Sequence, residues 1–229
     1  MKKIFRIIGI VAVVGLIVGS LIAASFAKPS TRDKIWDEAT TMGNLDAKNH
    51  FVVYSDIVCP YCVAFENAIL EHEEEFQQYL ADNDILFEVR MSDFLYEYGE
   101  SRSQASRDSA NATYCAKSEG KFWDYYSLAI YTVWNNYFKD GGKAAYTKLG
   151  TLGEDFWIEL GEEVGLGETF ADCVRNDDKI NELETTSAKM AKVSHGMPYF
   201  KFNNYATSGF DLSWGWEYVL MYFDAGLKS

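Results

Sequence analysis

The feature that most constrains the fold of this chain is a pair of cysteines, Cys59 and Cys62, placed between a strand pattern and a helix pattern. The preceding run Phe51–Tyr54 is short, apolar and rich in strand-forming residues, which is typical of a buried central strand. After the pair, apolar residues recur every three or four positions and predict one face of an amphipathic helix, formed by Tyr61, Phe65, Ala68, Ile69, His72, Phe76, Tyr79 and Leu80. The sequence therefore predicts an α/β fold with the two cysteines at the start of a helix.

This position suits thiol chemistry. The backbone N–H groups at a helix N-terminus lack partners, and together with the helix dipole they stabilise a thiolate, the reactive form of cysteine. We therefore predict that Cys59 is the attacking sulfur and that Cys62, one turn further on, resolves the mixed disulfide. Pro60 is compatible with the first helical turn, and Tyr61 offers a substrate an aromatic surface beside the sulfur.

The alternative for the pair is half of a zinc site completed by Cys115 and Cys173. Structural zinc sites usually take their ligands from short, paired spacings. The other two cysteines stand alone, 53 and 111 residues after Cys62, and the three histidines lack ligand spacing. The spacing favours a redox pair, and we expect neither a metal nor another cofactor.

The N-terminus predicts export. Lys2, Lys3 and Arg6 precede an uncharged run, Ile7–Ala27, of 21 residues. A spanning helix needs about 20 residues and a signal-peptide core about 7–15, so the length favours a retained signal-anchor over residues 1–28, with the basic end in the cytoplasm. Cleavage after Ala27 is the alternative. Both interpretations place the rest of the chain outside the cytoplasm, and the first predicts a single-pass transmembrane helix in the cell membrane.

An extracytoplasmic location changes how the remaining cysteines are interpreted, because disulfides form and persist there. Cys115 and Cys173 both lie in a long stretch of helical periodicity, about 101–193. We therefore predict a structural disulfide between them.

After residues 1–28, the chain divides into two predicted parts. Residues 29–49 are polar and predict a linker or a short helix that ends near Met42, and residues 50–229 predict the folded domain. Strand patterns are expected at 85–91, 199–202 and 207–210, the last two after the helical insertion. A final helix follows, with Gly226 as its expected C-terminal cap.

The charge of the chain bears on its partners. The net charge is −13, and without the four positive charges of residues 1–28 the remainder carries −17. Such a surface repels phosphate backbones, so we expect no nucleic-acid partner.

Four segments in order resemble the DsbA family of thiol:disulfide oxidoreductases, which have a thioredoxin-like fold with a helical insertion. The first contains Tyr54-Ser55-Asp56 and Cys59-Pro60-Tyr61-Cys62, and the second contains Cys115-Ala116 and Glu119-Gly120-Lys121-Phe122-Trp123. The third is Phe170-Ala171-Asp172-Cys173-Val174, and the fourth is Gly196-Met197-Pro198-Tyr199-Phe200. The resemblance extends from about Gly43 to Leu227.

The resemblance implies that Pro198 follows a cis peptide bond, lies against the cysteine pair and takes part in catalysis, with Met197 facing the sulfur and the substrate. Two positions differ from the pattern of the family. Val53 stands where relatives often carry a buried acid, and Met197 stands where threonine or valine is commoner.

The expected function is the introduction of disulfides into secreted or envelope proteins through Cys59 and Cys62. Its substrates would be unfolded or reduced exported proteins, and a membrane redox partner would recycle the pair. Two alternatives remain open from the sequence: an extracytoplasmic reductase or isomerase, and a tethered binding module whose Cys59–Cys62 disulfide is only structural.

Overall fold

The computed structural model describes residues 32–97, 99, 102–140, 142–194 and 196–229. The basic end and the apolar segment 7–27 lie outside these residues, so anchoring and export stay predictions. Among the helices that the structure does describe, none is both long and apolar enough to cross a membrane.

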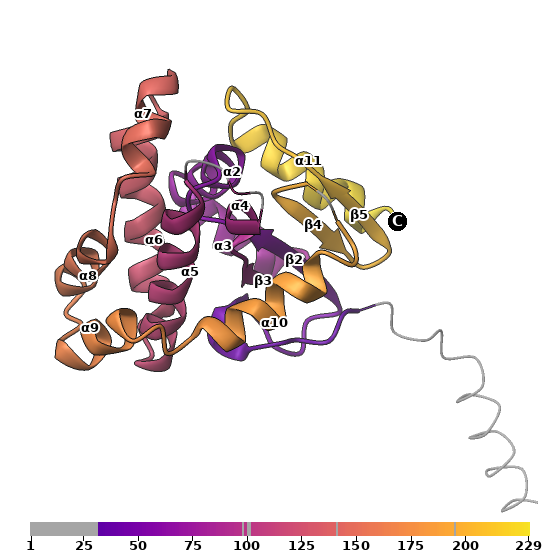
Figure 1. Ribbon diagram of the computed structural model, residues 1–229. Helices are drawn as coiled ribbons and strands as arrows, with labels where there is room; N and C mark the ends of the chain where they lie inside the picture. The colour runs from indigo at the N-terminus through magenta and orange to yellow at the C-terminus, as the bar shows by residue number, and fades with distance from the viewer. Residues whose placement is uncertain (1–31, 98, 100–101, 141, 195) are drawn as a thin grey trace, which may run out of the picture. The chain divides into compact units, whose positions relative to one another are not determined.

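A five-stranded sheet forms the centre of the fold (Figure 1). The strand order is β1-β3-β2-β4-β5, with the bounds β1 Thr41–Gly43, β2 Asn49–Ser55, β3 Ile85–Met91, β4 Tyr199–Phe202 and β5 Tyr205–Ser208. β2 and β3 are parallel, and each of the other neighbouring pairs is antiparallel. The residues of β2 and β3 are almost all buried, as expected for strands with both faces covered. The strands predicted at 51–54, 85–91 and 199–202 are confirmed.

The last strand begins earlier than the sequence predicts. Phe202 and Tyr205 face each other across the hairpin, so the turn consists of Asn203 and Asn204 alone. Asn203 has a φ of 50°, a left-handed conformation that asparagine tolerates better than most residues. This tight turn starts β5 at Tyr205 rather than at Thr207.

The described part of the segment 29–49 contributes to the sheet and is not a linker. After a short 3₁₀ turn, η1 (Glu38–Thr40), β1 pairs with β3 along its outer edge. Gly43 ends β1 with a φ of 103°, and a Cβ atom there would lie 2.7 Å from the Ile85 carbonyl oxygen. A strand forms in this segment because the outer backbone N–H and C=O groups of β3 need hydrogen-bond partners, and β1 supplies them.

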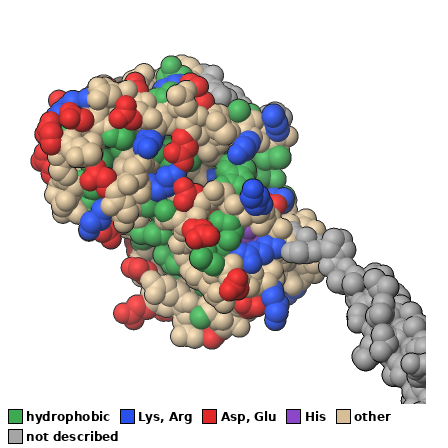
Figure 2. Space-filling view, turned by 90° about the horizontal axis from the view of Figure 1, so that it is seen from below, with side chains coloured by type: hydrophobic (Ala, Val, Ile, Leu, Met, Phe, Trp, Pro, Cys, Tyr) green, Lys and Arg blue, Asp and Glu red, His purple; other side chains and the backbone are tan. Residues whose placement is uncertain are grey.

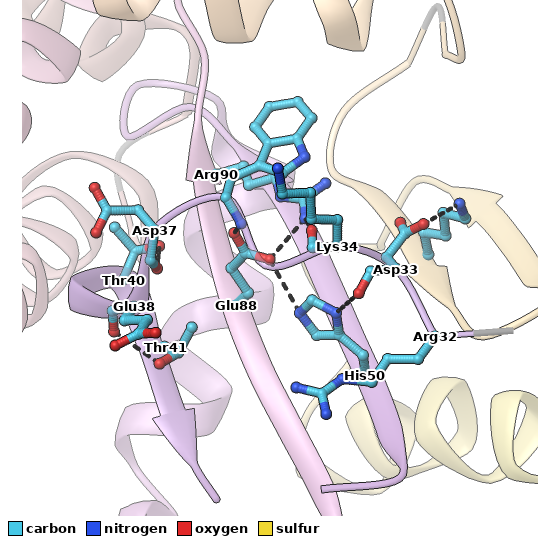
Figure 3. Close-up of polar contacts among 12 residues, drawn as sticks. Arg32, Asp33, Lys34, Asp37, Glu38, Thr40, Thr41, His50, Glu88 and Arg90 are labelled. Atoms are coloured by element: carbon cyan, nitrogen blue, oxygen red, sulfur yellow. Dashed lines mark hydrogen bonds and ion pairs between the residues drawn. The ribbon is translucent and has the colours of Figure 1, made fainter. Parts of the chain in front are cut away.

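Residues 32–37, the N-terminal arm, are held by a buried charged cluster (Figure 3). His50 Nδ1 lies 3.1 Å from the Asp33 carbonyl oxygen, and the Trp36 N–H donates to Glu88 Oε1 at 2.9 Å. The Arg90 guanidinium lies 3.9 Å from the centre of the Trp36 ring. The arm therefore enters the domain in a defined position on β2 and β3.

The helix predicted after the cysteine pair is divided into α2 (Pro60–Leu70) and α3 (Glu73–Asp82). His72, between them, has non-helical torsion angles (φ −127°, ψ 35°). Its ring stacks on Trp216 of the last helix, with 5.3 Å between the ring centroids, and its side chain is 38% exposed. Tertiary packing thus breaks a pattern that is continuous in the sequence and leaves His72 half-buried.

The helical insertion predicted for 101–193 is present. Figure 1 shows α5 to α9 grouped beside the sheet and α10 leading back towards β4. The bounds are α4 Phe94–Glu97, α5 Ser103–Ser118, α6 Phe122–Val133, the π-helical turn η2 Trp134–Phe138, α7 Gly142–Leu149, α8 Glu154–Glu163, α9 Glu168–Arg175 and α10 Ile180–Met190. Gly153 and Gly167 directly precede α8 and α9 and are their N-cap residues.

The last helix, α11 (Trp216–Leu227), packs on the sheet through aromatic rings. The rings of Phe51 and Phe223 stack with 3.9 Å between their centroids. Gly226 is inside the helix and is not its C-terminal cap, which is Lys228. A Cβ atom on Gly226 would lie 1.9 Å from the Phe202 ring, so this glycine allows α11 to approach β4 closely.

The charged side chains on the face shown in Figure 2 are interspersed, with acidic groups among basic and apolar ones.

Candidate active site

The cysteine pair lies at the start of α2, directly after the loop that follows β2. Cys59 is the residue before the helix, and its carbonyl group accepts a hydrogen bond from the Val63 N–H at 3.0 Å. Pro60 is the first helical residue, where its missing N–H leaves no hydrogen bond unmade. Both cysteines are free thiols in this structure. The predicted junction is confirmed, and Cys59 stands directly before the first turn of α2, whose first N–H groups have no partner within the helix.

The two sulfurs differ in their surroundings. Cys59 is 5% exposed and Cys62 is fully buried. Burial raises the pKa of the Cys62 thiol well above its usual value, and the hydrogen bond and charge of Cys59 raise this pKa further. The arrangement suits a reactive outer sulfur and a shielded inner sulfur that holds its proton.

Asp56 organises the loop that carries Cys59. Its carboxylate accepts hydrogen bonds from the N–H groups of Val58 at 3.0 Å and Leu95 at 3.1 Å, and from the Ser106 hydroxyl at 2.7 Å. Complete burial raises its pKa to about 6, against the effect of these hydrogen bonds. The sequence places Asp56 near the pair but does not show its burial, because two of its partners come from distant segments.

The residues predicted to contact substrate surround one groove. Cys59, Pro60, Tyr61 and Met197 line a groove of about 330 Å³. Tyr61 is 45% exposed at its rim, whereas Met197 is buried. The bond from Met197 to Pro198 is cis, as the sequence predicts, and Pro198 is buried directly before β4. The fold therefore brings the Pro198 segment to the cysteine pair from far along the chain.

Four further groove residues come from the insertion and the segment before it. They are Phe94, Leu95, Arg102 and Tyr146. The Arg102 guanidinium lies 4.9 Å from the centre of the Tyr146 ring and donates to the Val58 carbonyl group at 2.7 Å. Sequence reasoning missed these residues because no local motif marks them.

The second cysteine pair is a disulfide. Cys115 on α5 and Cys173 on α9 are joined, with 5.9 Å between their Cα atoms. The predicted disulfide is confirmed, and it connects two helices of the insertion. It also excludes a zinc site made from all four cysteines, because these two sulfurs are bonded to each other.

Val53 occupies the position at which relatives often carry a buried acid. It lies in the centre of β2, between Val89 of β3 and Phe200 of β4, and is fully buried. The strand therefore presents an apolar side chain to the core at this point.

The fold and the cysteine pair define a thioredoxin-like protein with a helical insertion. A family model described as thioredoxin matches residues 37–205, which is most of the chain, and the protein belongs to the thioredoxin family. A search of the curated proteins found no match.

Solved structures with a similar fold are thiol:disulfide oxidoreductases by name. The reduced disulfide bond oxidoreductase DsbG of Mycobacterium tuberculosis has 19% identity and a TM-score of 0.57, covering 83% of this chain and 88% of its own. The thiol-disulfide oxidoreductase MdbA of Corynebacterium diphtheriae has 16% identity and a TM-score of 0.56, covering 80% and 85%. The thiol-disulfide exchange protein alpha-DsbA2 of Wolbachia pipientis has 19% identity and a TM-score of 0.56, covering 83% and 89%. These solved structures share the thioredoxin-like fold with a helical insertion that the resemblance to the DsbA family implies.

Proposed function

We propose that this protein is a protein-disulfide oxidoreductase that works outside the cytoplasm and transfers the Cys59–Cys62 disulfide to reduced exported proteins. The observation that carries the proposal is the position of Cys59, at the N-terminus of α2 and on the wall of a groove. A thiolate there is stabilised by backbone N–H groups and can be reached by a client sulfur.

The reaction consists of two exchanges. A client thiolate attacks the Cys59 sulfur, the Cys59–Cys62 bond breaks, and its electron pair moves to Cys62. A second client thiolate then attacks the client sulfur of the mixed disulfide and releases Cys59. The client loses two electrons and gains a disulfide, and a membrane redox partner restores the enzyme disulfide.

The substrate class follows from the groove. Pro60, Tyr61 and Met197 offer an apolar surface beside Cys59, and this surface suits an unfolded client segment. The resemblance to the DsbA family implies that the backbone beside the cis bond at Pro198 pairs with such a segment in an extended conformation.

The direction of transfer follows from the helix terminus and the expected location. Stabilising the Cys59 thiolate favours the reduced pair, which makes the disulfide a stronger oxidant. A donor finds oxidisable clients outside the cytoplasm, whereas a reductase there needs electrons delivered across the membrane. Both arguments favour an oxidase over a reductase or isomerase.

The experiment that tests this proposal is the reduction potential of the Cys59–Cys62 couple, measured by equilibration with glutathione, acid quenching and alkylation. We expect a potential clearly more oxidising than the value of about −270 mV known for thioredoxin. A potential near that value would assign the protein to the reductases instead. If the Cys59–Cys62 pair exchanges with no thiol at all, the hypothesis that remains is a tethered binding module in which this disulfide is only structural.

A further inference from the structure

Trp36, in the N-terminal arm, packs against both the sheet and α10. The Arg90 guanidinium of β3 lies 3.9 Å from the centre of its ring, and the Lys189 ammonium group of α10 lies 4.2 Å from it. The ring also meets Tyr54 of β2 edge-on, with 5.6 Å between the ring centroids. A bulky indole therefore occupies the space where α10 packs over the sheet, and cation–π contacts fix it on both elements.

A row of side chains connects Trp36 with β4. Tyr54 stands opposite Arg90 of β3 and opposite Tyr199 of β4, so these three side chains lie side by side on one face of the sheet. The rings of Tyr54 and Tyr199 are 5.8 Å apart between centroids. Tyr199 is buried and directly follows Pro198, whose peptide bond is cis. Trp36 thus reaches the residue after the cis bond through a single intervening ring.

The segment that carries Met197 and Pro198 is fixed at both ends to the elements that pack around Trp36. α10 ends at Met190, and β4 begins at Tyr199. At its start, the Met190 carbonyl group accepts from the Ser194 N–H at 3.0 Å, and at its end the Pro198 carbonyl group accepts from the Gly209 N–H at 2.8 Å. Because the segment is short, the spacing between α10 and the sheet decides where Met197 lies in the groove beside Cys59.

We propose that Trp36 is a positioning residue for client binding: it sets the spacing between α10 and the sheet, and with it the position of Met197 and Pro198. The inference rests on the proposed thiol–disulfide exchange and adds the N-terminal arm to the parts of the chain that determine client affinity. Trp36 is not one of the residues that line the groove, so it acts through Tyr54 and α10 and not by contact with the client.

The role of Trp36 predicts a specific kinetic change when the indole is removed. With alanine at this position, α10 can settle towards the sheet, and the segment with Met197 and Pro198 moves with it. A client strand then pairs with a displaced backbone, which weakens binding. Cys59 and Cys62 belong to α2 and the loop before it, so the exchange between the sulfurs keeps its geometry.

The test is the oxidation of a synthetic peptide with two cysteines by the full chain, with glutathione disulfide as the terminal oxidant. Trp36→Ala should raise the KM for the peptide about 10-fold and leave kcat within about twofold of the wild type. Dithiothreitol, which is too small to need the Met197–Pro198 segment, should reduce the Cys59–Cys62 disulfide of both proteins at the same rate. A wild-type KM in W36A would overturn the inference, and so would equal losses in the two reactions.

Two variants separate positioning from stability. Trp216 is another half-buried indole, at the start of α11, where it stacks on His72 with 5.3 Å between the ring centroids. Trp216→Ala should destabilise the fold and leave the KM for the peptide unchanged. Trp36→Phe retains an aromatic ring between the sheet and α10 and should return the KM to within about threefold of the wild type. A KM raised as much in W216A as in W36A would show that client affinity follows stability, which contradicts the inference.

A measurement on the wild type keeps the inference testable if W36A fails to fold. Coupling between two positions is reciprocal, so a peptide bound in the groove should change the surroundings of Trp36. With serine in place of its cysteines, the peptide binds without reacting. The indole N–H NMR signal of Trp36, assigned with W36F, should shift as this peptide saturates the protein, whereas the signal of Trp216 should stay. A Trp36 signal that does not move at saturation contradicts the inference.

Failure of the proposed function has a different signature. A wild-type chain that oxidises no peptide would overturn the proposed function, and the inference with it. Oxidation by the wild type with an unchanged KM in W36A overturns the inference alone.

Discussion

The imidazole of His50 and the carboxylate of Glu88 face each other within the sheet, with 3.0 Å between Nε2 and Oε2 and neither side chain exposed. Arg90 Nη2 lies 2.7 Å from the same carboxylate oxygen. Burial alone would raise the pKa of Glu88, but hydrogen bonds from His50 and Arg90 outweigh burial and hold this pKa below its ordinary value. Glu88 is therefore the charged centre of the cluster in Figure 3 that holds the N-terminal arm.

Replacing Glu88 with alanine should lower the free energy of unfolding by about 3 kcal/mol, because Arg90 would remain buried without its anion. Urea unfolding at pH 7 measures this loss. Lys121→Ala, which removes an exposed pair with Asp124, is the control and should cost less than about 0.5 kcal/mol. Equal losses in the two variants would show that the buried cluster does not stabilise the fold.

The stability of the wild type should fall as the pH rises through the window set by Glu66. Its pKa is about 8 when folded and ordinarily 4.5, so between these values the folded chain retains a proton that the unfolded chain has released. The glutamine side chain of the variant Glu66→Gln cannot ionise. Between pH 4 and pH 9 the wild type should therefore lose on the order of 4 kcal/mol of its free energy of unfolding that the variant keeps. Urea titrations at a series of pH values measure the difference. Parallel curves for the two proteins would contradict the assigned pKa.

Removing the Cys115–Cys173 disulfide should destabilise the insertion without slowing exchange at Cys59. The two cysteines are separated by 58 residues, for which chain closure predicts a loss of roughly 4 kcal/mol in the double variant Cys115→Ala, Cys173→Ala. Urea unfolding gives the loss, and glutathione exchange gives the rate at Cys59. A variant of unchanged stability would mean that the helices hold the insertion together without the bond.

The difference in exposure between the two active cysteines predicts which of them forms the mixed disulfide. Because Cys59 is partly accessible and Cys62 is fully buried, Cys62→Ser should accumulate client complexes through Cys59. Non-reducing gels followed by mass spectrometry identify the linked peptide. Complexes that form through Cys62 in Cys59→Ser would reverse the two roles.

The apolar N-terminal segment predicts where the mature protein is located. If Ile7–Ala27 is retained as an anchor, the mature protein should fractionate with membranes and resist extraction by high salt. Fractionation combined with N-terminal sequencing of the mature chain checks this. A soluble mature protein that begins at Lys28 would establish cleavage after Ala27.

Local patterns predict much of the fold and of the site. The apolar run before Cys59 and the helical repeat after Cys62 define the junction, because strand and helix place side chains with different periods. The two cysteines of the insertion predict their disulfide because both lie in one helical block and export was expected, and the structure contains the bond. The resemblance at Met197-Pro198 predicts the cis bond, which the structure contains.

Local patterns fail where a distant partner decides the structure. The division between α2 and α3 depends on the stacking of His72 on Trp216, and β1 forms because β3 has an open edge. Gly226 has the sequence position of a helix cap, but its role is the close contact of α11 with Phe202. Each of these contacts joins residues far apart in the sequence, so periodicity does not reveal it.

The sequence by itself determined the reactive chemistry: which cysteines form the active pair, which form the structural bond, and where helix and strand meet. Only the tertiary structure decided the surroundings of that chemistry. It buried Asp56 and Glu66, placed Arg102 and Tyr146 on the groove, and opened a separate cavity at Glu66. The physical reason is that reactivity at a helix terminus arises from local backbone geometry, whereas burial and solvent access depend on which distant segments pack around a residue.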